Sequence, residues 1–197
     1  RSAEQLLDLY ELEEGEPLRH LALSVWGTAT MRNGGEDIAQ MFALLGVRPV
    51  WDGPTRRMVD LELIPLTLLE RPRVDVTLRM SGLFRDAFPQ LLAWVDHALN
   101  MVAGVDESDS DNPLAAVTRI KGPQSRLFGS APGSYGAGLQ ALMDSGQWEQ
   151  RDELGEAYLA WSSWRYDAEA TAHNDPAGLE QALQDVQVVL HLSLIHI

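Results

Sequence analysis

The chain has 197 residues, of which 45% are hydrophobic and 22% charged, as in an ordinary globular protein. Its net charge of −14 repels nucleic-acid phosphate, so nucleic-acid binding is disfavoured. The chain has no apolar run near the roughly 20 residues that span a bilayer, no secretory signal and no cysteine, which favours a cytoplasmic protein without disulfides or thiolate metal sites.

The first elements along the chain predict a strand followed by a helix. Residues 1–17 are acidic and helix-like, and we interpret them as the end of a preceding segment. The apolar run 20–26 predicts a buried strand. The Gly/Thr/Asn-rich stretch 27–35 predicts a loop, and residues 36–45 have helical spacing and stop at Gly46.

A pair of short strands and then a longer one come next. Residues 49–51 and 58–64 predict two strands joined by an Asp-Gly-Pro turn. Residues 74–80 alternate apolar and polar side chains with a period of two, which predicts a strand. The apolar face from Phe84 to Val102 predicts a long helix that kinks or restarts at Pro89.

The second half of the chain predicts mostly helices. Residues 104–113 are a polar, acidic linker or surface loop, and helices are expected at 137–144, 147–164 and 176–190, the last with Asp175 as its cap. The fold class is therefore α/β: a partly parallel sheet with flanking helices over residues 18–104, then a mainly helical segment over residues 105–191. Residues 192–197 resemble a translated sequencing adapter, so we expect a fragment and exclude them from the fold.

Two predicted loops leave the carboxyl ends of strands and enter helices, at residues 27–35 and 81–86. Ligands of open α/β sheets usually bind at this edge. Each loop carries an arginine, Arg32 or Arg85, whose forked guanidinium suits a carboxylate. The alternative is that both arginines are surface or capping residues, paired with Glu36 and Asp86.

Other chemistry-bearing residues give a weaker pattern. The glycine-rich segment 128–138 permits close backbone approach to a flat ligand, but it matches no phosphate-binding fingerprint. The spacing of His20, His97 and His173 is not that of metal ligands. His191 ends the last predicted helix, where it is placed to donate to the terminal carbonyl groups.

Several stretches, in the same order over about residues 18–191, resemble the large subunits of class I metal chelatases, and the cobalt-inserting subunits more than the magnesium-inserting ones. They are Val25–Thr28, Gly35–Gln40, Leu45–Asp52, Leu63–Leu66, Arg71–Val76, Ser81–Phe88, Phe128–Leu139 and Val188–His191.

The resemblance implies an enzyme that forms nitrogen–metal bonds within a large cytoplasmic subunit. The substrate metal is Co²⁺, the tetrapyrrole is hydrogenobyrinic acid a,c-diamide on the aerobic cobalamin pathway, and ATP is hydrolysed by an AAA+ ATPase subunit with a companion subunit. The resemblance gives no metal ligands. It assigns catalytic roles to His191 and Asp86, and substrate binding to Trp26, Thr28, Arg32, Arg85 and Tyr135.

Three alternatives remain open at this point. A magnesium chelatase subunit acting on protoporphyrin IX keeps the family but changes the metal. A docking segment for the ATPase partner would use the acidic stretch Asp106–Asp111 and touch no ligand. A generic nucleotide-binding α/β domain is disfavoured because phosphate-binding motifs are missing from the sequence.

Overall fold

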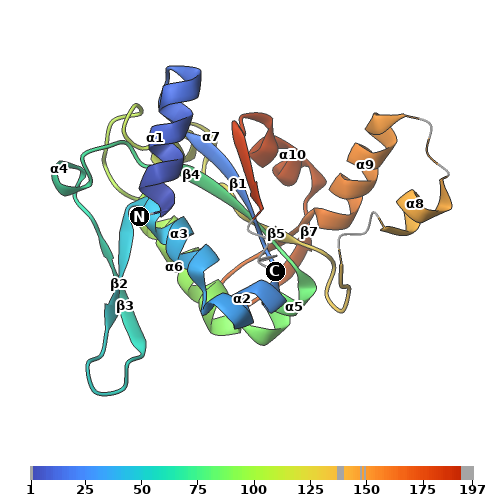
Figure 1. Cartoon of the computed structure of the whole chain (residues 1–197), viewed down its shortest axis with the longest axis horizontal. Helices are drawn as coiled ribbons and strands as arrows, with labels where there is room; N and C mark the ends of the chain where they lie inside the picture. Colours follow the sequence, from blue (N-terminus) through green and yellow to red (C-terminus); the bar gives the residue numbers. More distant parts are fainter. Residues whose placement is uncertain (1, 137–139, 147, 149, 192–197) are drawn as a thin grey trace.

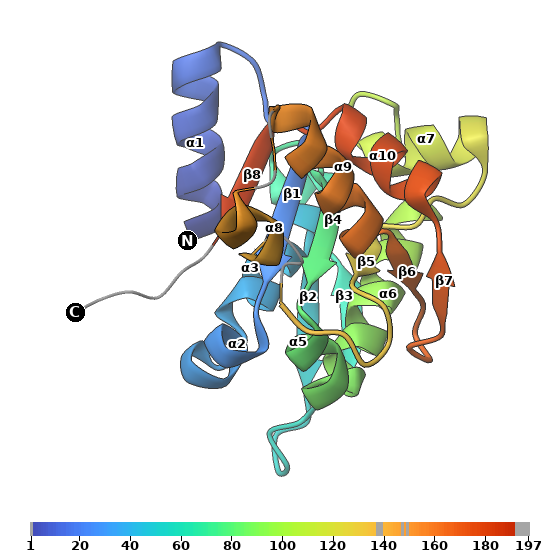
Figure 2. The ribbon, with the colours of Figure 1, turned by 90° about the vertical axis from the view of Figure 1, so that its right-hand side faces the viewer.

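A computed structural model describes residues 2–136, 140–146, 148 and 150–191. Its centre is a six-stranded sheet with the order β7-β6-β5-β4-β1-β8 (Figures 1 and 2). The strands are β1 (His20–Val25), β4 (Asp75–Met80), β5 (Leu127–Gly129), β6 (Trp164–Tyr166), β7 (Ala172–Asn174) and β8 (Val188–His191). No helix in the described part of the chain is long and apolar enough to cross a membrane.

The middle of the sheet is parallel, which confirms the predicted α/β class. β1 pairs in parallel with both β4 and β8, and β4 pairs in parallel with β5. β6 and β7 extend the sheet in antiparallel pairs. Every residue of β4 is buried, as expected for a central strand covered on both faces.

The elements near the start of the sheet match the prediction except in one loop. Helix α1 spans Ser2–Glu14, and α3 spans Glu36–Leu45 and ends at Gly46 in the left-handed region. The predicted loop 27–35 is wrong in part, because it contains helix α2 (Gly27–Asn33) before two left-handed glycines. The kink at Pro89 is confirmed: α5 (Gly82–Ala87) ends before α6 (Pro89–Ala103) begins.

The second half contributes more strand than the sequence predicted. Its helices are α7 (Pro113–Lys121), α8 (Gln140–Ser145), α9 (Arg151–Ser162) and α10 (Pro176–Gln184), and four short strands lie between or after them. The predicted helix 176–190 is wrong beyond Gln184, since Val188–His191 form β8. The Asp175 cap is confirmed, because its side chain accepts a hydrogen bond from Gly178 N. Residues 137–139, 147, 149 and 192–197 lie outside the described residues.

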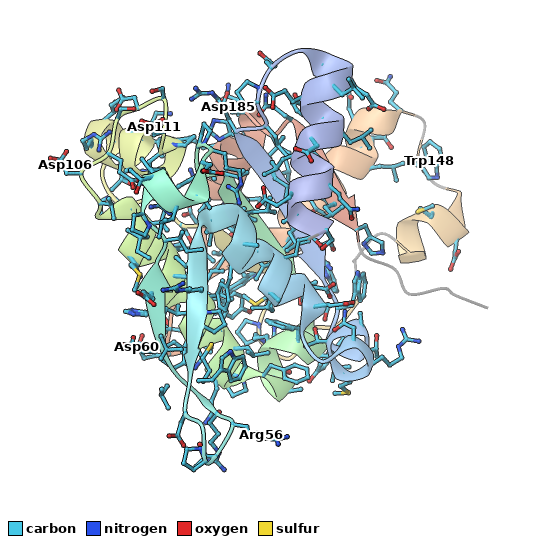
Figure 3. All side chains as sticks on the ribbon, turned by 60° about the vertical axis from the view of Figure 1, so that its left-hand side comes forward. Arg56, Asp60, Asp106, Asp111, Trp148 and Asp185 are labelled. Atoms are coloured by element: carbon cyan, nitrogen blue, oxygen red, sulfur yellow. The ribbon has the colours of Figure 1, made fainter. Side chains whose placement is uncertain are left out.

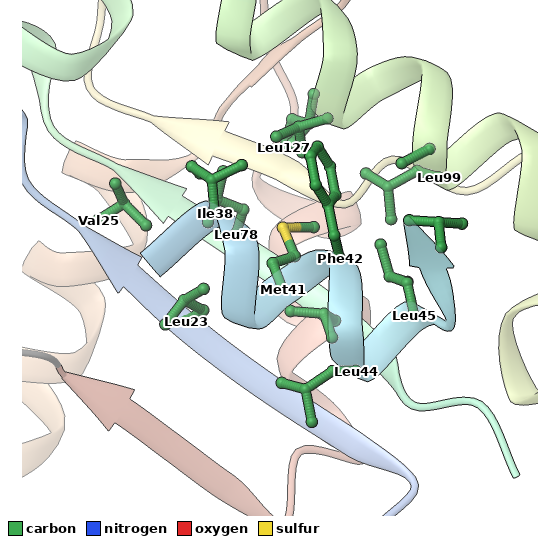
Figure 4. Packing of buried hydrophobic residues seen from close by; sticks show 14 of the residues in the cluster. Leu23, Val25, Ile38, Met41, Phe42, Leu44, Leu45, Leu78, Leu99 and Leu127 are labelled. Carbon is green, nitrogen blue, oxygen red and sulfur yellow. The ribbon is translucent and has the colours of Figure 1, made fainter. Parts of the chain in front are cut away.

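Helices cover the two faces of the sheet. In Figure 2 α9 and α10 lie in front of β1 and β4, while α3 and α6 lie behind them. The main hydrophobic core is on the α3 side, where Leu23, Val25 and Leu78 of the strands meet Ile38 and Met41 of α3 (Figure 4). Side chains alternate along a strand, so the neighbours Ser24 and Arg79 point to the α9/α10 face.

A hairpin beside α3 forms a second, two-stranded sheet. Its strands β2 (Val47–Trp51) and β3 (Met58–Leu63) are antiparallel, as the predicted turn required, and the short helix α4 (Leu66–Leu69) follows. Behind it, the fully buried Arg73 forms a two-pronged ion pair with Glu107, with distances of 2.7 and 2.8 Å. This ion pair joins the acidic loop to the body of the domain.

Candidate functional site

The carboxyl edge of the sheet brings together residues from three adjacent parallel strands. In register, His191 of β8 lies beside Ser24 of β1, and Ser24 lies beside Arg79 of β4. Side chains in one row of a parallel sheet share a face, and Thr77, two residues before Arg79, donates to Ala182 O of α10. The row therefore lies on the α9/α10 face, at the end of the strands where ligands usually bind.

Trp26 directly follows the last residue of β1 and lies next to this row. Its ring meets the His191 ring edge-to-face, with centroids 6.2 Å apart, and the Arg79 guanidinium carbon lies 5.4 Å from its centroid. The indole Nε1 is buried and finds no hydrogen-bond partner among the described residues. An aromatic plane flanked by an imidazole and a cation is a suitable platform for a flat, polar macrocycle.

Arg79 is buried at this edge, with 6% of its surface exposed. One terminal nitrogen donates to Gly136 O at 3.0 Å, while its Nε has no hydrogen-bond partner in the part of the chain that the structure describes. Burial lowers the pKa of its guanidinium, though arginine keeps its charge at any ordinary pH. The site therefore contains a buried positive charge without a carboxylate among the described residues.

Asp37 is a second buried polar group near the same edge, on α3. One carboxylate oxygen accepts a hydrogen bond from Asn33 Nδ2 at 3.3 Å, and within residues 2–136, 140–146, 148 and 150–191 the other has no hydrogen-bond partner. Burial raises the pKa of the Asp37 carboxyl, against smaller opposite effects of Asn33 and of nearby His191. The carboxyl is therefore easier to protonate than an ordinary aspartate.

The predicted pair Arg85 and Asp86 is engaged within the protein. Arg85 is buried and binds Asp86 with both Nε and Nη2, at 2.6 and 3.0 Å, while Nη1 donates to Ser130 O, Ala131 O and the Tyr166 hydroxyl. The hydrogen bonds from Arg85 hold the pKa of Asp86 below its ordinary value. The predicted pairing of Arg85 with Asp86 is thus confirmed, but the surface position that went with it is wrong, because Arg85 is buried.

Tyr135 joins this cluster by donating to Asp86 Oδ2 at 2.7 Å. The tyrosine is exposed, and it lies on the glycine-rich segment that also supplies Gly136 to Arg79. Asp86 raises the pKa of the Tyr135 hydroxyl, so the phenol stays protonated as a donor. The cluster fixes the glycine-rich segment against the start of α5.

Thr28 and Arg32 lie on α2 beside the edge and point outward. Both are exposed, and Arg32 Nε donates to Thr28 O within the same helix at 3.3 Å. An ion pair between Arg32 and Glu36 is not found in the part of the chain that the structure describes. These two residues are near the row but are not part of its contacts.

A groove on the α3/α6 face is the other concave feature near these loops. It has a volume of about 1010 Å³. Its lining includes Gly34, Gly35, Phe42, Trp51, Phe88 and Trp94. Its walls are mainly apolar, and it lies across the sheet from Arg79, so it does not bring the candidate residues together.

Two residues of the edge were missed by the sequence prediction, Arg79 and Asp37. Arg79 was counted only among the polar alternating residues of strand 74–80. Burial of the polar face of this strand would have marked Arg79 as unusual. The helices that bury this face, α9 and α10, begin more than 70 residues later in the chain, so the strand's own sequence does not reveal them. In the described residues, no group of three His, Cys, Asp or Glu side chains is placed to hold a metal ion.

Comparison with known proteins gives a consistent family. Residues 1–193 match the family model CobN/Magnesium Chelatase. The aerobic cobaltochelatase subunit CobN of Pseudomonas aeruginosa is 46% identical over 97% of this chain, and the rice chloroplast magnesium-chelatase subunit ChlH is 29% identical over 95%. A solved structure, the catalytic subunit of cobaltochelatase from Mycobacterium tuberculosis, superposes with a TM-score of 0.90 at 42% identity over 95% of this chain. The chain spans 17% of the length of each cobaltochelatase and 14% of the magnesium chelatase.

Proposed function

This chain belongs to the CobN/magnesium chelatase family, and we propose that it forms part of the tetrapyrrole site of a cobaltochelatase large subunit. The reaction is the ATP-dependent insertion of Co²⁺ into hydrogenobyrinic acid a,c-diamide in the cytoplasm, with ATP hydrolysed by an AAA+ subunit and its companion. Co²⁺ is a substrate here. The observation that carries the proposal is the row of Trp26, Arg79 and His191 at the carboxyl edge of a parallel sheet.

The identities support cobalt over magnesium. The cobaltochelatase relatives are 42–46% identical to this chain, while the magnesium chelatase subunits are 29–31% identical. Because metal and ring choice are set by contacts at the site, the more similar group is the better guide to the substrate.

The chemistry requires a base at the ring. Metal insertion forms metal–nitrogen bonds while two pyrrole-type N–H protons leave, and each proton needs an acceptor. His191 is exposed at the edge and its ring lies against Trp26, so an imidazole nitrogen is available to accept a proton from a bound ring. Asp86 is the poorer base, because its bonds from Arg85 and Tyr135 favour the ionised form and occupy its lone pairs.

The other residues support this arrangement in different ways. Trp26 offers a face or edge of its ring to the macrocycle, and the exposed Thr28 and Arg32 lie on α2 beside the row of Trp26, Arg79 and His191. Arg85 and Tyr135 hold the glycine-rich segment in place through Asp86, and they act as positioning residues.

Single-turnover cobalt insertion by a His191→Asn variant of the full large subunit tests the base. We expect tetrapyrrole affinity within about threefold of the unaltered subunit and an insertion rate about 10²-fold lower, as for loss of a general base. His173→Asn is the control, since that exposed histidine lies on β7 at the far edge of the sheet. An insertion rate unchanged in His191→Asn would remove His191 from the mechanism.

The docking alternative rests on a different region. Asp106 and Asp111 lie on the acidic loop, at the end of the molecule away from the hairpin tip that carries Arg56 (Figure 3). Asp111 O accepts from Arg73 N just before β4, so this loop is at the amino end of the sheet. Asp109 pairs with Arg119, and both are exposed.

The distance between these regions lets one experiment separate the two functions. If Asp109→Asn and Asp111→Asn abolish ATPase coupling while Trp26 and Arg79 variants leave tetrapyrrole binding intact, the docking function is the correct one. The opposite result supports the tetrapyrrole site.

A further inference from the structure

Among the described side chains, four arginines are buried, and three of them have a carboxylate partner. Arg73 pairs with Glu107, Arg85 with Asp86, and Arg126 with Asp75, each through two nitrogens. The fourth is Arg79, which donates to the carbonyl of Gly136, lies against the Trp26 ring and interacts electrostatically with the Tyr158 phenol, but has no carboxylate partner among the described residues. Its exposed fraction of 6% is similar to the 5% of Arg85 and the 7% of Arg126, so solvent does not replace the missing anion.

An unpaired buried charge is costly to a folded protein. Transfer of a guanidinium out of water requires a compensating anion or a set of hydrogen bonds, and Arg79 has one hydrogen bond and an unsatisfied Nε. The chain has 29 acidic residues, so an internal partner would have been easy to provide. Such a cost is typical of a site that is completed by its ligand.

The position of Arg79 indicates where that ligand lies. Arg79 shares its row and face with His191, two strands away, and neighbouring strands are about 4.8 Å apart. Two strand spacings therefore place the backbones of Arg79 and His191 about 10 Å apart. At this separation, His191 can face the centre of a bound macrocycle while Arg79 faces its rim. Because the rim of a corrin precursor carries acetate and propionate chains, Arg79 is placed for a rim carboxylate.

We propose that Arg79, with Trp26 beside it, is the subsite for a rim carboxylate of the tetrapyrrole, and so a specificity-determining residue of the reaction. The proposal rests on the proposed tetrapyrrole site. The carboxylate takes both the unpaired Nε and the Nη2 now bound to Gly136, in the two-pronged geometry of the other three arginines.

Entry of the carboxylate requires the Gly136 carbonyl to move away from Arg79. This carbonyl accepts one hydrogen bond from Arg79 Nη2 at 3.0 Å, so a single bond is exchanged when the carboxylate binds. Gly133 and Gly136 both have positive φ, at 75° and 86°, a conformation that glycine adopts without strain.

The test compares two probes in the full large subunit, hydrogenobyrinic acid a,c-diamide and its permethyl ester, by absorbance titration. The unaltered subunit should bind the acid at least tenfold more tightly than the ester, with a preference that falls as salt is raised. Arg79→Gln should lose about 10- to 100-fold in affinity for the acid and little for the ester, and Arg79→Lys should recover part of the loss. Arg48→Gln, on the exposed hairpin, is the control for lost charge.

The outcomes distinguish this inference from the proposed function. If the unaltered subunit binds neither probe, the tetrapyrrole site itself is wrong. If it binds the acid and Arg79→Gln binds it equally well, the site stands and the role of Arg79 is wrong.

A purely structural role is separated by the unfolding midpoint without ligand. It should be unchanged or higher in Arg79→Gln, because the unpaired charge is gone, whereas a structural arginine would lower it. Equal affinity of the unaltered subunit for acid and ester overturns the inference without any substitution.

Discussion

Arg85 shows how the structure changes the meaning of a residue that the sequence singled out. Its place at the end of a strand favoured ligand binding, but Nε, Nη1 and Nη2 all donate within the protein, to Asp86, two carbonyl groups and Tyr166. The sequence placed Arg85 and Asp86 side by side and allowed their pairing. It gave no sign of Tyr166, which lies 81 residues away in the chain.

Substitution Arg85→Gln should therefore act on stability. We expect the free energy of unfolding to fall by about 2 kcal/mol, because two carbonyl groups and Asp86 lose a charged donor in a partly buried place. Urea unfolding measures this, with Arg32→Gln as the exposed control, expected to stay within about 0.5 kcal/mol. An Arg85→Gln protein of normal stability that no longer binds the tetrapyrrole would restore Arg85 as a direct ligand contact.

Asp37 predicts a dependence of stability on pH. Burial raises the pKa of its carboxyl in the folded state, so the folded state binds this proton more tightly than the unfolded chain. The resulting stabilisation is complete below the unfolded pKa of about 3.9 and is lost as pH rises through the folded pKa.

Asp37→Asn cannot ionise, so it should be more stable than the unaltered protein at pH 7, with a difference that shrinks as pH falls toward 4. Thermal unfolding across this range measures it, and Asp106→Asn on the acidic loop is the control. A difference that grows at low pH would contradict the assignment.

At the scale of elements, the contact between α2 and α5 holds the two edge loops together. Gly27 N donates to Ser81 Oγ at 3.1 Å, and the same oxygen accepts from Phe84 N. A Cβ on Gly27 would lie 2.7 Å from Leu83 Cγ and 2.8 Å from Phe84 N, so only glycine allows this approach.

Gly27→Ala should lower the free energy of unfolding by about 1–3 kcal/mol, as overpacking does, and weaken tetrapyrrole binding with it. Gly53→Ala is a matched control, because nothing lies within 4 Å of its added Cβ. Equal unfolding midpoints for the two variants, measured by denaturant titration, would show that the two loops are less tightly joined than described.

The elements that the sequence missed are those stabilised by distant partners. β8 was read as the end of a helix because Leu179, Leu183, Val186 and Leu190 have helical spacing. In the structure the Gln187 side chain accepts from Arg19 N and His20 N, and Val188–His191 then pair with β1. Tertiary pairing overrides local periodicity here, and it is this strand that brings His191 to the edge.

For the whole molecule, the sequence predicted the α/β class, the parallel pairing of its first strands and the family. The pattern of apolar residues is enough for the class and the parallel pairing, because each strand and its following helix are local units, whereas the family was predicted from the resemblance of several ordered stretches. The site was predicted only in part. Trp26 and His191 were both predicted site residues, and their rings are in contact. The importance of Arg79 follows only from the structure, in which β4 lies between β1 and β5 and is covered by α9 and α10.

The most direct test of the central claim is metal insertion by the full large subunit that carries this chain, mixed with its ATPase partners and ATP. It would be offered Co²⁺ with hydrogenobyrinic acid a,c-diamide and, separately, Mg²⁺ with protoporphyrin IX. The account predicts ATP-dependent formation of the cobalt product and none of the magnesium product. Magnesium insertion would keep the family and contradict the choice of substrate, and failure of both reactions with competent partners would contradict the tetrapyrrole site itself.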